Sequence, residues 1–437
     1  MFSSELPRPR DSRPLPPLPH PQNRRVVVTG MGVVSPVGSS VATFWDSLLT
    51  GRSGIAPITL FDASNYPCPY AAEVKDFDPT SVVEPKRVPT FSRPTLFGLG
   101  AALQCVANAE WHSRPGDGVC GVVGGTANTA QGAVEEAILL AEKHGFRATR
   151  QLWYTLTKAF PHAMASEVGR RTGFQAKALT ISTACTAGLN AVDQSMRLIR
   201  RGECDCVLTP AADATITENL YPYFCRAGML ATSDLPPNRI SRPFDAQRSG
   251  GILGEGGACL LLEDLAHARR RQAPILCEVL GAGSCGEGYS ADNEDAFVGG
   301  VVRALEEALA DASLSPATID YVGCHGVSDP TLDRLETLSL KRVFGEEGAY
   351  RIPMSSIKAL TGMPLSVGGL LQTIATTQAI QNDLLPPTHN YENPDPECDL
   401  DWVPNTPRRN RIGRALIWGH GFNGSDSAIV IGAVRQP

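Results

Sequence analysis

The sequence has no long apolar run, no cysteine pair of the CxxC type and no excess of basic charge. No stretch approaches the roughly 20 apolar residues that a membrane-spanning helix requires, so we expect no membrane association. The 39 basic and 45 acidic residues give a net charge of -6, and a chain with this balance has no overall attraction to nucleic acid or anionic membranes. An acidic partner therefore has to meet a local basic patch.

The cysteines that are present form neither a metal-binding nor a disulfide pattern. All 12 are scattered along the chain, and no secretory leader precedes them. We therefore expect reduced thiols in a soluble, cytoplasmic protein. Cys204 and Cys206 form a CxC pair, but a zinc site needs a second pair of ligands. We expect two small buried side chains in a strand at this point, and no metal site.

The first 22 residues differ in composition from the remainder of the chain. Residues 1–22 are rich in Pro and Arg, cannot bury a core, and are predicted to form a disordered or polyproline tail. Beyond them, strand-like and helix-like segments alternate, which favours an α/β fold. The stretches "RRVVVTGMGVVSPVGSS" near residue 25 and "PILCEVLGAGSCGEGYS" near residue 274 each read as an apolar strand with a GxG, which suggests two similar halves.

The first GxG, formed by Gly30 and Gly32, does not predict a dinucleotide site. A dinucleotide-binding fingerprint needs a third glycine and an acidic residue about 20 positions further on, whereas Val33 and Val34 lead here to Ser35. We interpret the GxG as a structural turn.

Cys185 lies where a predicted strand passes directly into a predicted helix. The β-branched run "KALTIST" precedes it, and Leu189, Val192 and Met196 follow at helical spacing. At a helix N-terminus the unpaired backbone N–H groups and the helix dipole favour a thiolate, and the small neighbours, including Gly188, allow close approach of a substrate. A buried structural cysteine is the alternative interpretation.

Three further segments place a residue with a reactive or mobile side chain at the end of a predicted strand or turn, close to a glycine. We call these segments, together with that of Cys185, glycine-edged junctions. "IDYVGCHGVSDP" places His325 just after a strand, "SSIKALTGMP" places Lys358 beside a glycine turn, and "ALIWGHGFNGSDSAIVIG" places Phe422 between two apolar strands. A lone histidine is more often structural than catalytic. Four such junctions together favour a catalytic site.

The motifs resemble those of the β-ketoacyl-acyl-carrier-protein synthases, the condensing enzymes of fatty-acid and polyketide synthesis. "TACTAG" resembles their nucleophile motif, "SRPFDAQRSGGILGEGG" their SRPFD…R.G…GEG segment, and "FDASNYPCPYAAEVKDFDP" their early insertion. The similarity runs from about Arg25 to Val434. It implies a thiolase-like α/β fold of two pseudo-duplicated α/β/α halves, at residues 23–272 and 273–437.

The resemblance also assigns catalytic roles. Cys185 matches the cysteine that accepts an acyl group from the phosphopantetheine thioester of an acyl carrier protein, and no other cofactor is implied. The backbone N–H groups of Cys185 and Phe422 match the oxyanion donors, and Phe422 is also the gating phenylalanine. His325 matches the first catalytic histidine, and Glu336 the carboxylate that pairs with the motif lysine, Lys358.

The most informative departure from the family pattern is Met363. Five residues after the motif lysine the family has a second histidine, and a thioether has no N–H to offer the enolate that forms when a malonyl thioester loses carbon dioxide. Loss of one such donor typically slows a reaction by about 100- to 1000-fold. Acyl loading depends on the cysteine and the backbone amides, so we expect acyl transfer to survive without condensation. His420 is a candidate for a replacement donor.

Other departures surround the same site. Val327 and Asp329 stand where the family has two threonines that contact the pantetheine arm. Asn128 stands where many members have an apolar residue at the mouth of the acyl pocket, which favours a polar acyl chain. In the last loop, Asn423 and Asp426 replace a glycine and an asparagine, so we expect a less mobile gate.

Alternatives to acyl transfer without condensation remain open, and the resemblance also implies partners. One alternative is an ordinary condensing synthase, and another is a non-catalytic partner similar to the chain-length factors, although those partners usually lack the cysteine. A cysteine hydrolase is a further alternative that the family resemblance disfavours. Carrier proteins are acidic, and Arg226 is the candidate docking residue. A dimer is implied, either with an identical chain or with a related ketosynthase chain.

Overall fold

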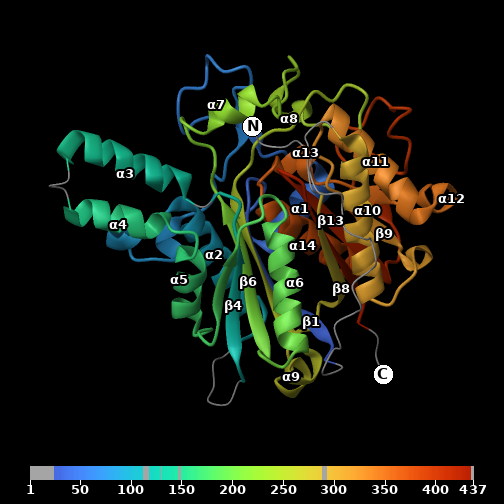
Figure 1. The fold of residues 1–437 in the computed structure, drawn as a ribbon, viewed down its shortest axis with the longest axis horizontal. Coiled ribbons are helices and arrows are strands. Elements are labelled where there is room, and N and C mark those ends of the chain that lie inside the picture. The colour runs from blue at the N-terminus through green and yellow to red at the C-terminus, as the bar shows by residue number, and fades with distance from the viewer. Residues whose placement is uncertain (1–23, 112–117, 129, 146–148, 288–292, 435–437) are drawn as a thin grey trace, which may run out of the picture.

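The computed structural model describes residues 24–434, apart from 112–117, 129, 146–148 and 288–292. The predicted tail, residues 1–22, lies outside the described residues. Among the described residues, ten strands form one mixed sheet in the order β10-β9-β13-β14-β8-β1-β7-β6-β4-β5 (Figure 1). Five belong to the first half of the chain: β1 (Val26–Val34), β4 (Cys120–Gly125), β5 (Ala178–Ile181), β6 (Cys206–Asp213) and β7 (Gly256–Asp264). Five belong to the second half: β8 (Cys277–Gly286), β9 (Tyr321–Gly323), β10 (Met354–Ser355), β13 (Arg414–Gly421) and β14 (Ser425–Gly432).

The two halves of the sheet repeat one topology. Outward from the centre, β1-β7-β6-β4-β5 corresponds to β8-β14-β13-β9-β10. In each half the first two pairings are antiparallel and the last two are parallel. The halves join where β1 pairs antiparallel with β8, with Val26 opposite Val279. The predicted pseudo-duplication is confirmed. The two similar stretches near residues 25 and 274 form β1 and β8, the central strands of the sheet. The boundary proposed between residues 272 and 273 stays a prediction.

The GxG in β1 is part of the strand, so its interpretation as a turn was wrong. A side chain on Gly32 would meet the backbone oxygen of Ala101 at 1.9 Å, and one on Gly30 would meet that of Cys105 at 2.4 Å. Both atoms belong to helix α2 (Arg93–Asn108). The glycines are there because this helix lies directly on the strand.

Helices pack against the sheet, some on the strands of one half and two on the strands of both halves. α2 and α5 (Ala163–Thr172) pack on strands of the first half, and α10 (Glu294–Asp311) packs on β8 and β14 and against α11 (Pro330–Phe344). α6 (Ala187–Arg200) and α14 (Val367–Asn382) contact each other and strands of both halves (Figure 1). Twelve of the 16 residues of α14 are buried, and these include one glutamine and three threonines.

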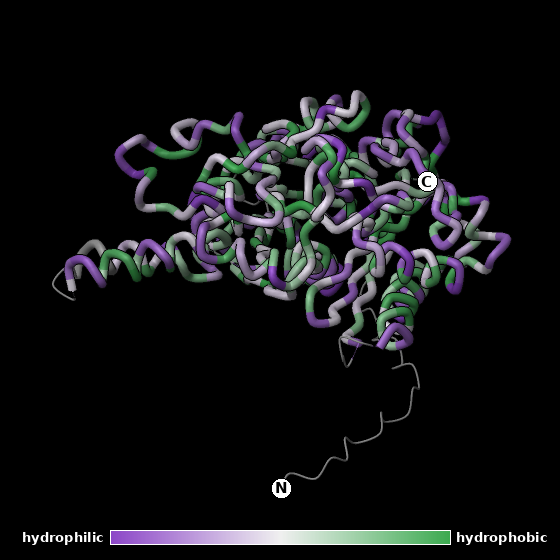
Figure 2. The backbone as a smooth tube through the Cα atoms, turned by 90° about the horizontal axis from the view of Figure 1, so that it is seen from above, coloured by the Kyte–Doolittle hydropathy of each residue, from purple (hydrophilic) through white to green (hydrophobic). Residues whose placement is uncertain are grey.

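The remaining elements are short or peripheral. The helices are α1 (Val41–Thr50), α3 (Gln131–His144), α4 (Thr149–Ala159), α7 (Tyr221–Arg226), α8 (Pro237–Ile240), α9 (Leu265–Arg270), α12 (Glu346–Ala349) and α13 (Lys358–Thr361), with 3₁₀ turns at Pro79–Ser81, Pro85–Thr90 and Pro316–Thr318. Two small sheets pair β2 (Ile55–Pro57) with β3 (Tyr70–Ala72) and β11 (Leu384–Leu385) with β12 (Arg408–Arg409). α3 and α4 form a hairpin that extends away from the body of the molecule (Figure 2). Within the described ranges, no helix combines the length and apolarity that crossing a bilayer requires.

Candidate active site

The four predicted junctions meet around one cavity of about 170 Å³. Cys185 follows β5, His325 follows β9, Lys358 follows β10, and Phe422 lies in the turn between β13 and β14. Eight of the residues singled out from the sequence line the cavity: Cys185, His325, Val327, Lys358, Met363, His420, Phe422 and Asn423. Segments far apart in the sequence therefore build a single site.

The turn that carries Cys185 is held in an uncommon backbone conformation. Ala184 has a φ of 52°, a left-handed value that non-glycine residues adopt only where the surroundings enforce it. The Thr186 hydroxyl donates to the Thr183 carbonyl at 2.6 Å, and the Asn190 amide donates to the Thr183 hydroxyl at 2.8 Å. The backbone N–H groups of Cys185 and Phe422 lie close enough to the Cys185 sulfur to lower the pKa of its thiol. Two amide groups are thus near the nucleophile.

The small residues after Cys185 serve helix packing. A side chain on Gly188 would lie 2.3 Å from the backbone oxygen of Ser366, which precedes α14. The expectation that Gly188 lets a substrate approach is corrected accordingly. It lets α6 and α14 approach each other, and this contact fixes where α6 begins.

Burial outweighs the helix dipole in setting the charge of the nucleophile. Burial raises the pKa of the Cys185 thiol to about 11, although the nearby Lys358 ammonium and the two backbone N–H groups lower it. The position at a helix N-terminus favours a thiolate, as expected from the sequence, but burial has the larger effect on the pKa. Lys358 is the nearby positive charge that favours the reactive form.

Replacing Lys358 with methionine is expected to slow alkylation of Cys185 by iodoacetamide about tenfold at pH 8, since removing a nearby positive charge raises a thiol pKa. In the wild type the rate should rise with pH toward the pKa of about 11. Intact-mass measurement between pH 7 and 10, with Cys185→Ala as background, gives the rate. Lys86→Met, which removes an exposed ammonium paired with Glu84, is the control. Equal rates for both variants would show that Lys358 does not influence the thiol.

The hydrogen bonds around His325 define which ring nitrogen faces a substrate. Its Nδ1 accepts the backbone N–H of His420 at 3.3 Å and lies 3.3 Å from the Lys358 ammonium, which also donates to the His325 carbonyl. Burial and the nearby Lys358 charge hold the pKa of His325 well below its usual value, so the ring is neutral. The proton is then on Nε2, and His325 can donate a hydrogen bond to a carbonyl or enolate oxygen.

Glu336 positions His325 and does not pair directly with Lys358. Its carboxylate accepts the backbone N–H groups of His325 at 2.9 Å and Gly326 at 2.7 Å, and the indole N–H of Trp418 at 2.8 Å. The ion pair expected from the sequence is not found among the described ion pairs, because Lys358 reaches the carbonyl side of His325 instead. Glu336 and Lys358 interact only through the longer-range attraction that raises the pKa of the lysine against the lowering effect of burial.

Met363 places an apolar side chain in the cavity where the resemblance predicts a histidine. It is 8 % exposed, and its backbone N–H donates to the Ile252 carbonyl at 2.6 Å. Its sulfur lies against Gly251, where an added side chain would be 2.4 Å away. Val327, 5 % exposed, lines the same cavity. This part of the wall offers no hydrogen-bond donor from either side chain.

Of two predicted substrate contacts, Asp329 has another role, and the place of Asn128 at the mouth of an acyl pocket stays a prediction. Asp329 does not line the cavity. Its carboxylate caps α11 by accepting the N–H groups of Thr331 and Leu332, both at 2.9 Å, as an aspartate before a helix commonly does. Asn128 also does not line the cavity that holds Cys185. Its backbone N–H donates to Asp213 at 3.2 Å.

The β13–β14 turn projects Phe422 over the cavity. Phe422 is 59 % exposed, and Asn423 has a φ of 70°, a conformation that asparagine tolerates better than most residues. His420, at the base of the turn, has its Nδ1 3.0 Å from Asp426. Burial opposes its protonation, but Asp426 and Glu287 raise the pKa of His420 to about 9. His420 as a replacement donor stays a prediction.

Sequence reasoning missed two polar residues at the site. Asp213, fully buried at the end of β6, accepts N–H groups of Ala127 and Ser366 and thereby ties the loop after β4 to the start of α14. Gln372 lines the cavity from α14, and its buried amide nitrogen has no hydrogen-bond partner among the described residues. The sequence could have indicated Asp213, because it lies inside the apolar stretch "TPAADAT". An aspartate is costly to bury without a partner, so a buried one is expected to have a specific hydrogen-bonding role.

Comparison with known proteins agrees with this geometry. Two family models match, "Beta-ketoacyl synthase, N-terminal domain" over residues 23–268 and "Beta-ketoacyl synthase, C-terminal domain" over residues 276–392. The chain is 39 % identical to a putative polyketide beta-ketoacyl synthase 1 of Streptomyces halstedii, covering 94 % of this chain and 98 % of the relative. It is 34 % identical to 3-oxoacyl-[acyl-carrier-protein] synthase 2 of Coxiella burnetii, covering 94 % and 99 %.

Solved structures give the same result. A type II PKS acyl-carrier protein in complex with its ketosynthase bound to the hexaketide matches with a TM-score of 0.85 and 31 % identity, covering 95 % of this chain and 100 % of that chain. The ishigamide ketosynthase/chain length factor matches with a TM-score of 0.84 and 29 % identity, covering 94 % and 100 %. The fold is thus that of the ketosynthases, with the thiolase-like arrangement predicted from the sequence, and the chain belongs to the β-ketoacyl synthase family.

Proposed function

We propose that this chain is a ketosynthase-type acyltransferase that loads an acyl group from an acyl carrier protein onto Cys185 and passes it to an acceptor, with impaired malonyl decarboxylation. One observation carries the proposal. The cavity holds the nucleophile beside the backbone N–H groups of Cys185 and Phe422, while the side chain of Met363, which lines the same cavity, supplies no donor. The groups that acyl transfer requires are therefore present in the cavity, whereas one of the hydrogen-bond donors that condensation requires is replaced by Met363.

The loading step follows from these groups. The Cys185 thiolate attacks the thioester carbonyl, and the N–H groups of Cys185 and Phe422 stabilise the resulting oxyanion. The intermediate collapses with loss of the pantetheine thiolate, which takes up the proton that Cys185 released. His325 does not act as a base toward Cys185 in this tautomer, because its Nδ1 is occupied and its Nε2 carries the proton.

The second half-reaction of a condensing enzyme makes a different demand. Loss of carbon dioxide from a malonyl thioester puts negative charge on the thioester oxygen, and N–H donors aimed at that oxygen lower the barrier. His325 supplies one such donor, and Met363 supplies none. Ordinary decarboxylative condensation is the competing function, and the observation in its favour is that His420 lines the same cavity.

Intact-mass analysis of the purified chain mixed with an acylated carrier and a malonyl carrier tests the proposal. We expect an acyl adduct on the wild type, none on Cys185→Ala, and an unchanged malonyl carrier. A β-ketoacyl carrier among the products would overturn the acyltransferase reading. Absence of any adduct would favour a non-catalytic partner chain.

The carrier is proposed to dock beside Arg226. This arginine ends α7 and is exposed, and Met229, three residues further on, lines the cavity. Arg226→Ala should raise the apparent KM for the acyl carrier by about three- to tenfold at low salt, because an acidic partner loses an opposite charge. Steady-state loading kinetics measure the effect. Arg201→Ala, at the opposite end of α6 from Cys185, should match the wild type, and an unchanged KM for Arg226→Ala would place docking elsewhere.

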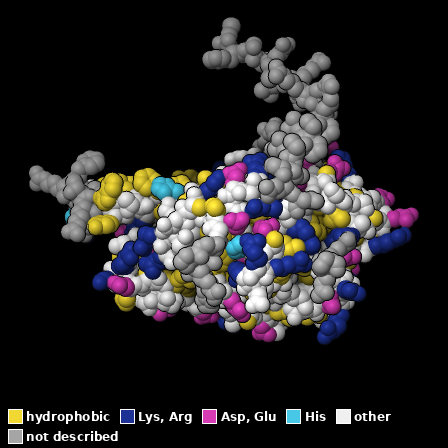
Figure 3. All heavy atoms as spheres, turned by 90° about the horizontal axis from the view of Figure 1, so that it is seen from below, with side chains coloured by type: hydrophobic (Ala, Val, Ile, Leu, Met, Phe, Trp, Pro, Cys, Tyr) yellow, Lys and Arg dark blue, Asp and Glu magenta, His cyan; other side chains and the backbone are white. Residues whose placement is uncertain are grey.

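A second ketosynthase-fold chain is proposed to cover the α3–α4 hairpin and the β5 edge. Ile138, Leu139 and Trp153 on the hairpin are 53 %, 62 % and 64 % exposed, and Figure 3 shows hydrophobic side chains on this projection. β5 is the last strand at its end of the sheet, and Leu179 on it is also exposed. A strand edge and an apolar surface of this kind are commonly covered by a partner. Light scattering of the chain alone distinguishes a homodimer from a chain that needs a related partner.

A further inference from the structure

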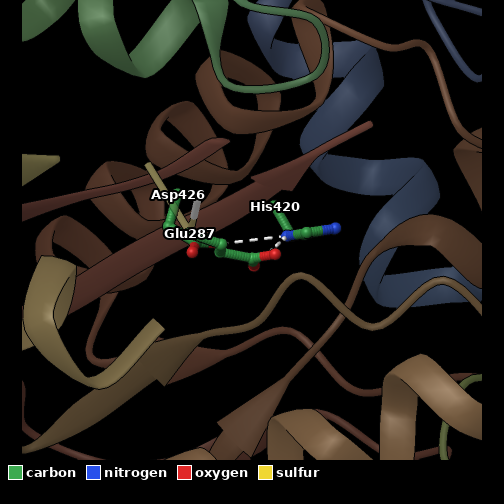
Figure 4. A group of neighbouring side chains, drawn as sticks. All are labelled: Glu287, His420 and Asp426. Atoms are coloured by element: carbon green, nitrogen blue, oxygen red, sulfur yellow. Dashed lines mark hydrogen bonds and ion pairs between the residues drawn. The ribbon is translucent and has the colours of Figure 1, made fainter. Parts of the chain in front are cut away.

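Glu287, His420 and Asp426 form a buried cluster at the base of the β13–β14 turn (Figure 4). The sheet brings them together. His420 lies opposite Asp426 across the β13–β14 pair, and Asp426 lies opposite Cys285 in β8, two residues before Glu287. The backbone N–H of Glu287 also donates to the Gly424 carbonyl at 3.0 Å. The three side chains therefore converge from the ends of three strands, and β8 is distant in the sequence from β13 and β14.

The three groups lie close enough together to share one metal ion. His420 Nδ1 lies 3.0 Å from Asp426 Oδ1 and 3.4 Å from Glu287 Oε1, and one ligand atom from each residue lies within 4.8 Å of the others. Ligands about 2.1 Å from a shared ion lie about 3.0 Å apart in octahedral geometry and about 3.4 Å apart in tetrahedral geometry. An imidazole with two carboxylates is also a usual ligand set for transition-metal ions.

The cluster has polar atoms that the described residues do not satisfy. Among the described residues, Oε2 of Glu287 and Oδ2 of Asp426 are buried without a hydrogen-bond partner, and Oε1 of Glu287 has only its ion-pair contact with His420. Both side chains are 0 % exposed. Burying a carboxylate without compensation is costly. A protonated His420 offsets one of the two negative charges, and a divalent cation offsets both.

We propose that Glu287, His420 and Asp426 bind a divalent first-row transition-metal ion that prefers nitrogen and oxygen ligands. Two of the ligands flank the turn that carries Phe422, and the third follows β8. The ion would fix the base of this turn to β8 and hold the Phe422 backbone N–H in place beside Cys185. Its role is structural, and it does not depend on whether the chain condenses or only transfers acyl groups.

Titration of the full-length, chelator-treated chain with Mn²⁺ tests the proposal, with free Mn²⁺ followed by its electron paramagnetic resonance signal. Mn²⁺ favours oxygen and nitrogen ligands over thiolates, so the 12 cysteines compete little. We expect one bound Mn²⁺ per chain and a higher Tm in its presence. Glu287→Gln and Asp426→Asn, which keep side-chain shape, should each weaken binding by about tenfold or more. Glu307→Gln, in the exposed carboxylate on α10 next to β8, should bind as the wild type does.

Two results would overturn the proposal. One is a wild-type chain that binds no Mn²⁺ and keeps its Tm, which means that the cluster holds a shared proton instead of a metal ion. The other is a Glu287→Gln, Asp426→Asn double variant with wild-type affinity, which places the bound ion elsewhere. The wild-type titration requires no variant, so a variant that fails to fold does not remove the first test.

Discussion

Met363→His is expected to raise the rate of malonyl-carrier decarboxylation by about 100- to 1000-fold, the usual effect of one donor placed at a developing oxyanion. Met363 lines the cavity with Cys185 and His325, so a ring N–H at this position lies in the cavity that also holds the His325 ring. The new side chain is no larger than the methionine, and it can occupy the space against Gly251 that the thioether now fills. The release of carbon dioxide from malonyl carrier provides the measurement.

The matched control is Met363→Leu, which keeps the volume and adds no donor. It should decarboxylate at the wild-type rate and should still form the acyl adduct on Cys185. Should Met363→His give no increase while His420→Ala abolishes a condensation activity already present in the wild type, the missing donor is His420 and the proposed limitation is wrong.

Glu336→Ala is expected to lower the free energy of unfolding by about 3–5 kcal/mol and to abolish acyl transfer. The substitution leaves the backbone N–H groups of His325 and Gly326 and the Trp418 indole N–H without their acceptor. Each buried donor that loses its partner costs about 1–3 kcal/mol. Because two of these donors belong to the loop after β9, the His325 ring also loses its fixed orientation. Chemical denaturation and the rate of acyl-adduct formation are the two measurements.

Glu336→Gln separates the loss of charge from the loss of hydrogen bonding. The amide oxygen can still accept N–H groups, but the amide nitrogen faces a donor, so the variant should lie between the wild type and Glu336→Ala in both measurements. If Glu336→Ala unfolds at the wild-type denaturant concentration, water replaces the carboxylate, and Glu336 has no structural role of the kind described.

Local and family-specific patterns predicted most of the fold and most of the cavity. A β-branched run followed at once by helical periodicity placed Cys185 between β5 and α6, and the spacing of glycine-edged junctions placed His325, Lys358 and Phe422. The helix cap formed by Asp329 could also have been predicted from the sequence, because an aspartate directly before a proline is a common helix start. It was missed because the residue was compared with a substrate contact in the family.

Features that depend on several distant segments were not predictable. The high pKa of Cys185 results from burial by parts of both halves, which competes with the dipole of α6. Lys358 contacts the His325 carbonyl instead of Glu336. This contact depends on the packing of the segment after β9 against the segment after β10. Glu287 joins His420 and Asp426 only because β8 and β14 are neighbours in the sheet. No spacing in the sequence encodes such contacts.

The duplicated topology divides the chemistry between two structurally equivalent loops. Cys185 follows β5 at one end of the sheet order, and Lys358 and Met363 follow β10 at the other end. The nucleophile therefore depends on the other repeat, because the Lys358 ammonium lowers the pKa of the Cys185 thiol. A substitution after β10 can change the reactivity of the nucleophile, as at Lys358, or the lining of the shared cavity, as at Met363.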